Sequence, residues 1–356
     1  MSRFLSARHA ALVPYTPGEQ PRDMQYTKLN TNESPFPPAQ AVVDAAASEA
    51  QKANLYCDPE CTALREKAAQ LYGCRPENIL PVNGSDEILY YAFMAFCDET
   101  HPAAFADITY GFYPVYAEIH HIPTKIIPLQ DDFTINPDDY CGLNMTIVIA
   151  NPNAPTGIAL PVSELERIIR TNPDNVVIID EAYVDFGGES IVPLIEKYKN
   201  LLVTQTFSKS RSLAGARLGF GIACKELIQD LNTIKYSTNP YNVNRMTQAA
   251  GTAAINNNDY YMDNCRVIME NRDYTTNRLR NMGFEVLPSC SNFIFVKSDK
   301  IEGEELYLKL KKSGVLIRHF DKSRISDYNR ITIGTREQMD ILLNKIRCIL
   351  AERGVK

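Results

Sequence analysis

The 356-residue sequence has few features of membrane, secreted or nucleic-acid-binding proteins. No apolar run approaches the ~18–20 residues that span a bilayer, and the first residues contain no long apolar segment of a secretory signal. No block of basic residues occurs and the formal charge is −6, which argues against a nucleic-acid surface. The sequence therefore predicts a soluble, cytoplasmic protein that binds neither membranes nor nucleic acid.

Metal and dinucleotide motifs are missing as well. The nine cysteines are mostly far apart, and the close pair Cys57 and Cys61 has no second pair at zinc-ligand spacing. The five histidines form no zinc pattern. Gly215, Gly219 and Gly221 do not have the G-x-G-x-x-G spacing of a nicotinamide-binding turn. We expect free thiols, no metal site and no dehydrogenase.

What the sequence does contain is an alternation of short apolar runs with helical segments. Several of the runs are continuously apolar, as expected for strands covered on both faces. Alternating strands and helices predict a mainly parallel α/β sheet. The predicted strands are residues 103–106, 146–150, 176–179, 201–203 and 218–223, and the clearest helices between them are 161–171 and 224–235.

The chain exceeds the usual size of a single domain. Residues 1–40 are rich in proline and predict an extended N-terminal arm that packs with a small domain. Residues 41–264 are expected to form a large domain. A long helical stretch at 242–282 leads into further short strands and helices, which predicts a smaller α+β C-terminal domain at 265–356.

One stretch after a predicted strand places Lys209 among hydroxyl side chains, with Arg217 eight residues further on. A lysine amine can form a Schiff base with a phosphorylated aldehyde, while Thr206, Ser208 and the arginine hold the phosphate. Taken alone, the stretch fits a solvated basic loop equally well.

A second candidate is Asp180 at the tip of a buried predicted strand, with Tyr183 three residues later. A buried carboxylate requires a cationic partner, and a protonated pyridine nitrogen is one that makes the ring an electron sink. A helix cap is the simpler alternative. Because Lys209 follows a neighbouring predicted strand, and ligands of such sheets lie at the carboxyl ends of strands, the cofactor interpretation is favoured.

Weaker candidates lie near other predicted strand ends. Ser85 begins a helix whose N-terminus suits a phosphate, and Tyr110 is placed to stack on a ring. The turn at 151–157 carries amide side chains, and Arg318 and Arg330 suit an anionic substrate. An ordinary N-cap, aromatic packing, a plain turn and surface salt bridges are the respective alternatives.

In order and spacing, these motifs resemble those of fold type I pyridoxal-phosphate aminotransferases, most of all the histidinol-phosphate branch. The matching segments cover nearly the whole chain: residues 14–18, 29–35, 56–59, 84–87, 110–111, 151–157, 180–183, 206–219, 240–244 and 330–334. The resemblance implies a seven-stranded, mainly parallel sheet of the aspartate aminotransferase-like fold, and a homodimer. It also implies pyridoxal 5′-phosphate and transamination between histidinol phosphate and 2-oxoglutarate, or imidazole-acetol phosphate and glutamate, in histidine biosynthesis.

The resemblance also implies roles for individual residues. The catalytic residues would be Lys209, Asp180 and Tyr183. The cofactor would be held by Ser85, Asp86, Tyr110, Thr206, Ser208 and Arg217, and Tyr56 would reach the cofactor of the neighbouring subunit. The substrate would be held by Tyr15, Asn32, Tyr241, Arg318 and Arg330. One position departs from the family, which commonly has asparagine before Pro-Thr-Gly where this chain has Ala154. We predict that Asn153 donates to the ring oxygen instead.

Three alternatives stay open on the same fold. Threonine-phosphate decarboxylases and aromatic amino acid aminotransferases have similar motifs, although residues 15–18 and 240–244 look more like the histidinol-phosphate branch. A non-catalytic ligand sensor is the third, but the arm before residue 40 is too short and irregular for a helix-turn-helix module.

Overall fold

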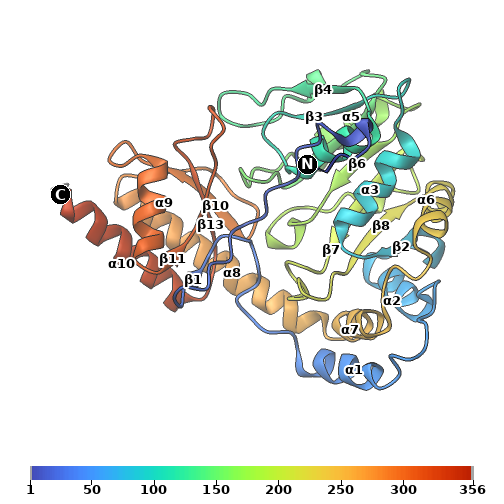
Figure 1. Ribbon diagram of the computed structural model, residues 1–356, viewed down its shortest axis with the longest axis horizontal. Helices are drawn as coiled ribbons and strands as arrows, with labels where there is room; N and C mark the ends of the chain where they lie inside the picture. The colour runs from blue at the N-terminus through green and yellow to red at the C-terminus, as the bar shows by residue number, and fades with distance from the viewer. Residues whose placement is uncertain (1, 354–356) are drawn as a thin grey trace.

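A seven-stranded sheet forms the centre of the larger part of the computed structural model, which describes residues 2–353 (Figure 1). The strand order is β2-β8-β7-β6-β5-β3-β4, and among these strands β8 alone runs antiparallel to its neighbours. The strands are β2 (Ile79–Val82), β3 (Ala103–Ala106), β4 (Thr124–Ile127), β5 (Thr146–Ala150), β6 (Val177–Asp180), β7 (Leu201–Thr206) and β8 (Gly219–Ala223). The predicted fold class is confirmed.

Two strands of this sheet, β2 and β4, were not predicted from the sequence. Both lie at sheet edges. Pro81 interrupts the strand pattern of β2, and proline is tolerated there because an edge strand leaves some N–H groups unpaired. In β4 only Ile127 is buried, so the apolar pattern is weak.

Helices cover both faces of the sheet. On one face the apolar residues of the strands pack with α3, α4 and α6, and on the other with α2, α5 and α7. Neighbouring residues of β5 divide between these layers, since Ile147 and Ile149 belong to one core cluster and Val148 to the other. The helices are α1 (Gln40–Ala50), α2 (Thr62–Tyr72), α3 (Ser85–Phe96), α4 (Phe112–His120), α5 (Val162–Thr171), α6 (Lys225–Thr238) and α7 (Arg245–Asn256).

The C-terminal part lies beside the large sheet, on the left of Figure 1. Its antiparallel sheet has the order β12-β13-β10-β9. The elements are α8 (Asn258–Asn281), β9 (Glu285–Val286), β10 (Phe293–Lys297), α9 (Gly303–Lys312), β11 (Val315–Leu316), β12 (Arg318–His319), β13 (Asn329–Thr332) and α10 (Arg336–Glu352). The predicted long helical stretch is two helices, because the chain leaves the helical path at Asn257.

The N-terminal arm crosses between the two parts and lies along the C-terminal one (Figure 1). Strand β1 (Thr27–Lys28) pairs in parallel with β11, and Glu19 forms an ion pair with Lys311 of α9. We propose the division into an arm at 1–40, a large domain at 41–264 and a small domain at 265–356. The second boundary falls inside α8, so one continuous helix joins the two domains.

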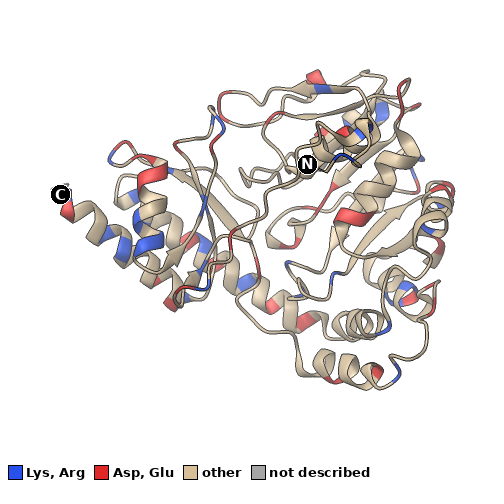
Figure 2. Ribbon diagram, in the orientation of Figure 1, with Lys and Arg blue, Asp and Glu red and all other residues tan. Residues whose placement is uncertain are grey.

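Short 3₁₀ helices complete the described elements: η1 (Ala7–His9), η2 (Pro76–Asn78), η3 (Pro137–Asp139), η4 (Val184–Phe186) and η5 (Val192–Leu194). Between residues 2 and 353, the helices are too short or too polar to cross a membrane. Figure 2 shows acidic and basic residues interspersed over both domains.

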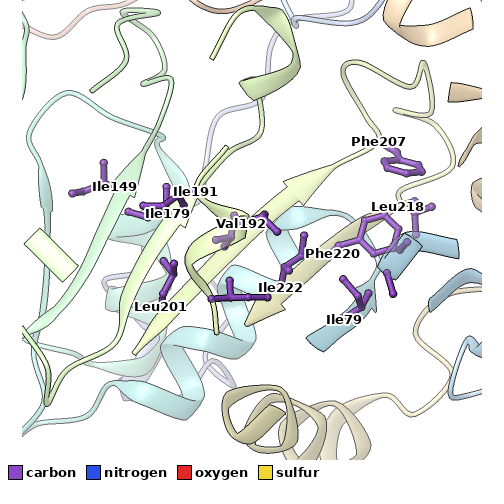
Figure 3. Close-up of a cluster of buried hydrophobic side chains, with 14 of the residues drawn as sticks. Ile79, Ile149, Ile179, Ile191, Val192, Leu201, Phe207, Leu218, Phe220 and Ile222 are labelled. Carbon is purple, nitrogen blue, oxygen red and sulfur yellow. The ribbon is translucent and has the colours of Figure 1, made fainter. Parts of the chain in front are cut away.

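The loop after β7 is held against the core of the large domain. Phe207 donates its backbone N–H to the carbonyl of Leu218 at 2.9 Å, which closes the loop at its base. The Phe207 ring packs edge-on against Phe220 at 5.0 Å between centroids (Figure 3). An ion pair of 2.6 Å joins the buried Arg211 to the partly buried Asp185 in the loop after β6. The segment that carries Lys209 therefore has a fixed position.

Candidate active site

Two adjoining cavities lie at the carboxyl ends of the central strands, where ligands of α/β sheets bind. The inner cavity, about 520 Å³, is lined by Ser85, Asp86, Tyr110, Ala150, Pro152, Ala154, Asp180, Ala182, Tyr183, Thr206, Ser208, Lys209 and Arg217. The outer cavity is lined by residues 15–18, 30–32, 108–111, Ala154, Pro155, Tyr183, Lys209, Arg318, Phe320, Lys322, Ile325 and Arg330. Four residues line both: Tyr110, Ala154, Tyr183 and Lys209.

Asp180 ends β6 and lines the inner cavity. Its carboxylate accepts hydrogen bonds from the Tyr113 hydroxyl at 2.8 Å and the Ala182 N–H at 3.2 Å. Burial raises the pKa of Asp180 to about 6. Within the described part of the chain no lysine or arginine pairs with it, so a cationic ligand in the cavity would remove the cost of its burial. The sequence predicted Asp180 but missed Tyr113, whose only signal was the aromatic run after β3.

Another group of residues lining the inner cavity combines donors suited to a phosphate. Helix α3 begins there, and the first N–H groups of a helix have no partner within it. Arg217 pairs with Asp86 at 2.9 Å. Gly84 is required for this approach, because its φ is +84° and an added Cβ would lie 2.6 Å from Nη2 of Arg217. Thr206 and Ser208 add hydroxyls, which are 3.0 Å apart. Helix dipole, hydroxyls and guanidinium together form an anion site.

Lys209 lies where the two cavities meet. Its Nζ donates to the carbonyl of Thr31 at 3.3 Å and lies 5.9 Å from the centre of the Tyr183 ring. No carboxylate in residues 2–353 lies within 4 Å of it, unlike Lys28, which pairs with Glu33. The amine can therefore reach a ligand in either cavity.

The outer cavity has unneutralised positive charge. Arg330 donates to the carbonyl of Asn30 at 3.0 Å, and its buried Nε has no acceptor among the described residues. Burial lowers the pKa of Arg330. Arg318 donates to the backbone carbonyls of Thr16 and Pro17 at 3.1 and 3.2 Å. Neither arginine pairs with a carboxylate between residues 2 and 353, so the cavity is suited to an anionic ligand.

Aromatic side chains close the region between the cavities. Tyr15 stacks on Phe112 with centroids 4.2 Å apart, although the sequence singled out only the former as a substrate residue. Tyr110 donates its hydroxyl to Asp86 at 2.7 Å, and burial raises the pKa of this phenol. The Tyr110 ring thus lies at the boundary with its hydroxyl anchored near the start of α3.

Three predicted site residues line neither cavity: Tyr56, Tyr241 and Asn153. Tyr56 and Tyr241 stack on each other with centroids 4.5 Å apart and are 79% and 42% exposed. They line neither cavity of this subunit. Their predicted roles require a second subunit or a movement of the chain.

The geometry argues against the prediction that Asn153 reaches a cofactor ring. Its amide donates to the carbonyl of Ile108 at 3.0 Å and to the hydroxyl of Thr156 at 3.1 Å. Its oxygen accepts from Thr109 at 2.9 Å. Both amide hydrogens are therefore used, one within the turn and one on the segment after β3, and the side chain lines neither cavity. Ala154 lines both but has no donor in its side chain.

Comparison with known proteins identifies the class to which this architecture belongs. The family "Aminotransferase class I and II" matches residues 25–346, and the chain belongs to this family. The histidinol-phosphate aminotransferase of Brachyspira hyodysenteriae is 50% identical over 98% of this chain and 99% of its own. The enzyme of the same name from Clostridium acetobutylicum is 44% identical over 98% and 100%.

A solved structure agrees in fold. The histidinol-phosphate aminotransferase of Sinorhizobium meliloti, solved with pyridoxal-5′-phosphate, superposes with a TM-score of 0.85. The match covers 92% of each chain at 23% identity. The predicted resemblance to the aminotransferases is confirmed, and the particular relatives are those of the histidinol-phosphate branch.

Proposed function

We propose that this chain is a pyridoxal-phosphate-dependent histidinol-phosphate aminotransferase of histidine biosynthesis. It transfers an amino group from glutamate to imidazole-acetol phosphate, which yields histidinol phosphate and 2-oxoglutarate, and the reaction is reversible. Relatives of that name at 43–50% identity over nearly full length support this assignment.

The inner cavity fits pyridoxal phosphate at both ends. Asp180 supplies a buried carboxylate for the pyridine nitrogen, and the cluster at the start of α3 supplies phosphate donors. Between these ends lie the amine of Lys209, the hydroxyl of Tyr183 and the ring of Tyr110. When bound, the cofactor joins the substrate nitrogen and withdraws electrons from the bond to be broken.

Lys209 would hold the cofactor's aldehyde carbon and then act on the substrate. Its position between the cavities would allow the freed amine to take the proton from the substrate α-carbon and deliver it to the former aldehyde carbon of the cofactor. Asp180 would stabilise the positive charge on the ring nitrogen. Tyr183 would donate a hydrogen bond to the ring hydroxyl oxygen.

The observation that carries the substrate assignment is a pair of arginines in the outer cavity, neither of which has a carboxylate partner among residues 2–353. Arg330 would bind the α-carboxylate of glutamate, since a guanidinium matches a carboxylate with two parallel hydrogen bonds. Arg318 and Tyr15 lie farther out, where the phosphate and imidazole of the second substrate would be held. Arg330 must therefore accept two different groups in the two half-reactions.

The exposed Tyr56–Tyr241 stack supports a homodimer. An aromatic pair with this exposure is typical of an interface, and Tyr56 would reach the cofactor phosphate of the other subunit. Light scattering of the holoenzyme would test the dimer.

Asn32 was predicted to bind substrate, but its amide is used within the protein. We also propose that this biosynthetic enzyme acts in the cytoplasm.

Mixing the holoenzyme separately with histidinol phosphate, threonine phosphate and phenylalanine tests the substrate assignment. Histidinol phosphate should convert the cofactor to its amine form, which is visible in the absorbance spectrum. Conversion by phenylalanine alone would indicate the aromatic enzyme, and carbon dioxide release from threonine phosphate would indicate the decarboxylase. Absence of an aldehyde-derived band after addition of cofactor would support a non-catalytic protein.

A further inference from the structure

Asn32 of the N-terminal arm is 1% exposed and connects three distant segments. Its amide Nδ2 donates to the hydroxyl of Tyr183 at 2.9 Å, and its oxygen Oδ1 accepts from the hydroxyl of Thr332 at 2.9 Å. Its backbone carbonyl accepts from the amide of Asn292 at 2.9 Å. The residue has a φ of +58°, a conformation that asparagine tolerates better than most residues. The side chain is therefore held in one place and orientation.

The direction of these hydrogen bonds follows from counting protons. The hydroxyl of Thr332 accepts from the backbone N–H of Asn32 at 3.0 Å, so its own proton is free to be donated to Oδ1. The other end of the amide, Nδ2, must then face Tyr183 and donate to it. The phenol accepts this bond and keeps its proton. No described residue accepts that proton, and the hydroxyl belongs to a side chain that lines both cavities.

This arrangement lies beside a position where a donor is missing. Ala154 lines both cavities with a side chain that has no donor, at the position where the resemblance in sequence implies an asparagine directed at the ring hydroxyl oxygen. The neighbouring Asn153 has used both amide hydrogens on Ile108 and Thr156. Among the described side chains at this edge of the inner cavity, Tyr183 is left as the donor whose proton has no protein acceptor.

We propose that Asn32 is a positioning residue that compensates for Ala154. By donating to the Tyr183 hydroxyl, it turns the phenol's own proton into the inner cavity toward the cofactor's ring hydroxyl oxygen. The proposal rests on the assignment of this cavity to pyridoxal phosphate. The same side chain joins Tyr183 to Thr332, which is two residues from Arg330 on β13, so it also fixes the phenol relative to the substrate arginine.

Replacing Asn32 by an isosteric acceptor tests the proposal. In Asn32→Asp the carboxylate accepts the Tyr183 proton and turns it away from the ring. A hydrogen bond to an anionic oxygen favours the ionised form, so its loss should raise the pKa of the visible absorbance change of the substrate-free holoenzyme by about one unit. The added negative charge also raises this pKa. The same substitution is therefore made in a Tyr183→Phe background, where only the charge effect remains.

The proposal is supported if Asn32→Asp raises the pKa of the absorbance change clearly more in the protein with Tyr183 than in the Tyr183→Phe protein. Equal pKa shifts in the two proteins overturn it. Asn32→Gly, which tolerates the positive φ, is the second variant if the aspartate protein does not fold. It should give a smaller shift in the same direction that disappears with Tyr183→Phe.

Adding Ala154→Asn to Asn32→Asp restores a donor at the usual position. In this double variant the pKa should return toward the parent value by at least half of the shift caused by Asn32→Asp. An unchanged pKa would contradict the idea that Asn32 compensates for Ala154. Because these spectra are recorded without substrate, their outcome is independent of whether histidinol phosphate is the substrate.

Discussion

The inner and outer cavities adjoin each other but are built in different ways. The inner cavity takes its polar side chains from strand ends and loops of one sheet, between residues 85 and 217, and Asp180 is only 4% exposed. The outer cavity is assembled from the arm, a loop after β3 and the small domain. There Tyr15 is 36% exposed and Arg318 is held by backbone carbonyls. In the proposed assignment, a cofactor site built from one sheet thus borders a composite site that must accept two substrates.

Loss of the lysine shared by both cavities should have the largest effect. Lys209→Ala is expected to lower kcat by about 10⁴-fold, because it removes the group that moves the substrate proton. Rapid mixing of the variant with glutamate, followed by absorbance, measures the half-reaction directly. Lys209→Arg keeps the charge and should be equally impaired. Activity within tenfold of the parent in either variant would show that another base serves the two cavities.

Substitution of Asp180 should show how much its burial in the inner cavity lowers the free energy of unfolding. Asp180→Asn is expected to lower kcat by about 10³-fold, since it removes the charge that keeps the ring nitrogen protonated. In the cofactor-free protein the same change should raise the free energy of unfolding at pH 8 by about 1–3 kcal/mol. The reason is that the fold raises the pKa of this carboxyl to about 6, so ionisation above that pH opposes folding.

The pH dependence gives the control for this prediction. Below about pH 6 the native carboxyl takes up a proton. The gain in free energy of unfolding from Asp180→Asn should therefore shrink, and it should disappear as the pH approaches the pKa of aspartate in the unfolded chain, about 4. Urea unfolding of both cofactor-free proteins at pH 8 and pH 5 measures this difference in free energy of unfolding. An equal difference at both pH values would mean that it does not come from ionisation of Asp180.

The same contrast explains what the sequence could predict. Inner-cavity residues such as Asp180 and Lys209 follow buried apolar strands, so the strand pattern itself predicts that they meet at one edge. Contacts of the outer cavity join residues about 300 positions apart, such as Asn32 with Thr332 and Arg330 with Asn30. Neither periodicity nor spacing encodes these pairs. Their location came from the resemblance, and their hydrogen bonds came only from the structure.

The two arginines should separate the half-reactions of the outer cavity. Arg330→Gln is expected to lower kcat/KM for glutamate by about 100-fold, because it removes charged hydrogen bonds to the carboxylate. Arg318→Gln should lower kcat/KM for histidinol phosphate by about tenfold and leave the glutamate half-reaction unchanged. Rapid-mixing kinetics of each half-reaction give both values. Equal losses on both substrates for Arg318→Gln would indicate that it only anchors the arm through Thr16 and Pro17.

The smallest functional effect is expected at Asn153, whose neighbours Pro152 and Ala154 line the inner cavity while its own side chain does not. Asn153→Ala leaves the carbonyl of Ile108 and the hydroxyl of Thr109 without their partner, so the free energy of unfolding should fall by about 1–3 kcal/mol. The pKa of the holoenzyme's visible absorbance change should stay the same, because neither amide hydrogen points to the ring. A shifted pKa with little loss of stability would show instead that Asn153 reaches the cofactor and replaces the asparagine missing at Ala154. In that case the inner cavity would itself rearrange on binding, and the contrast between a rigid cofactor site and an adaptable substrate site would no longer hold.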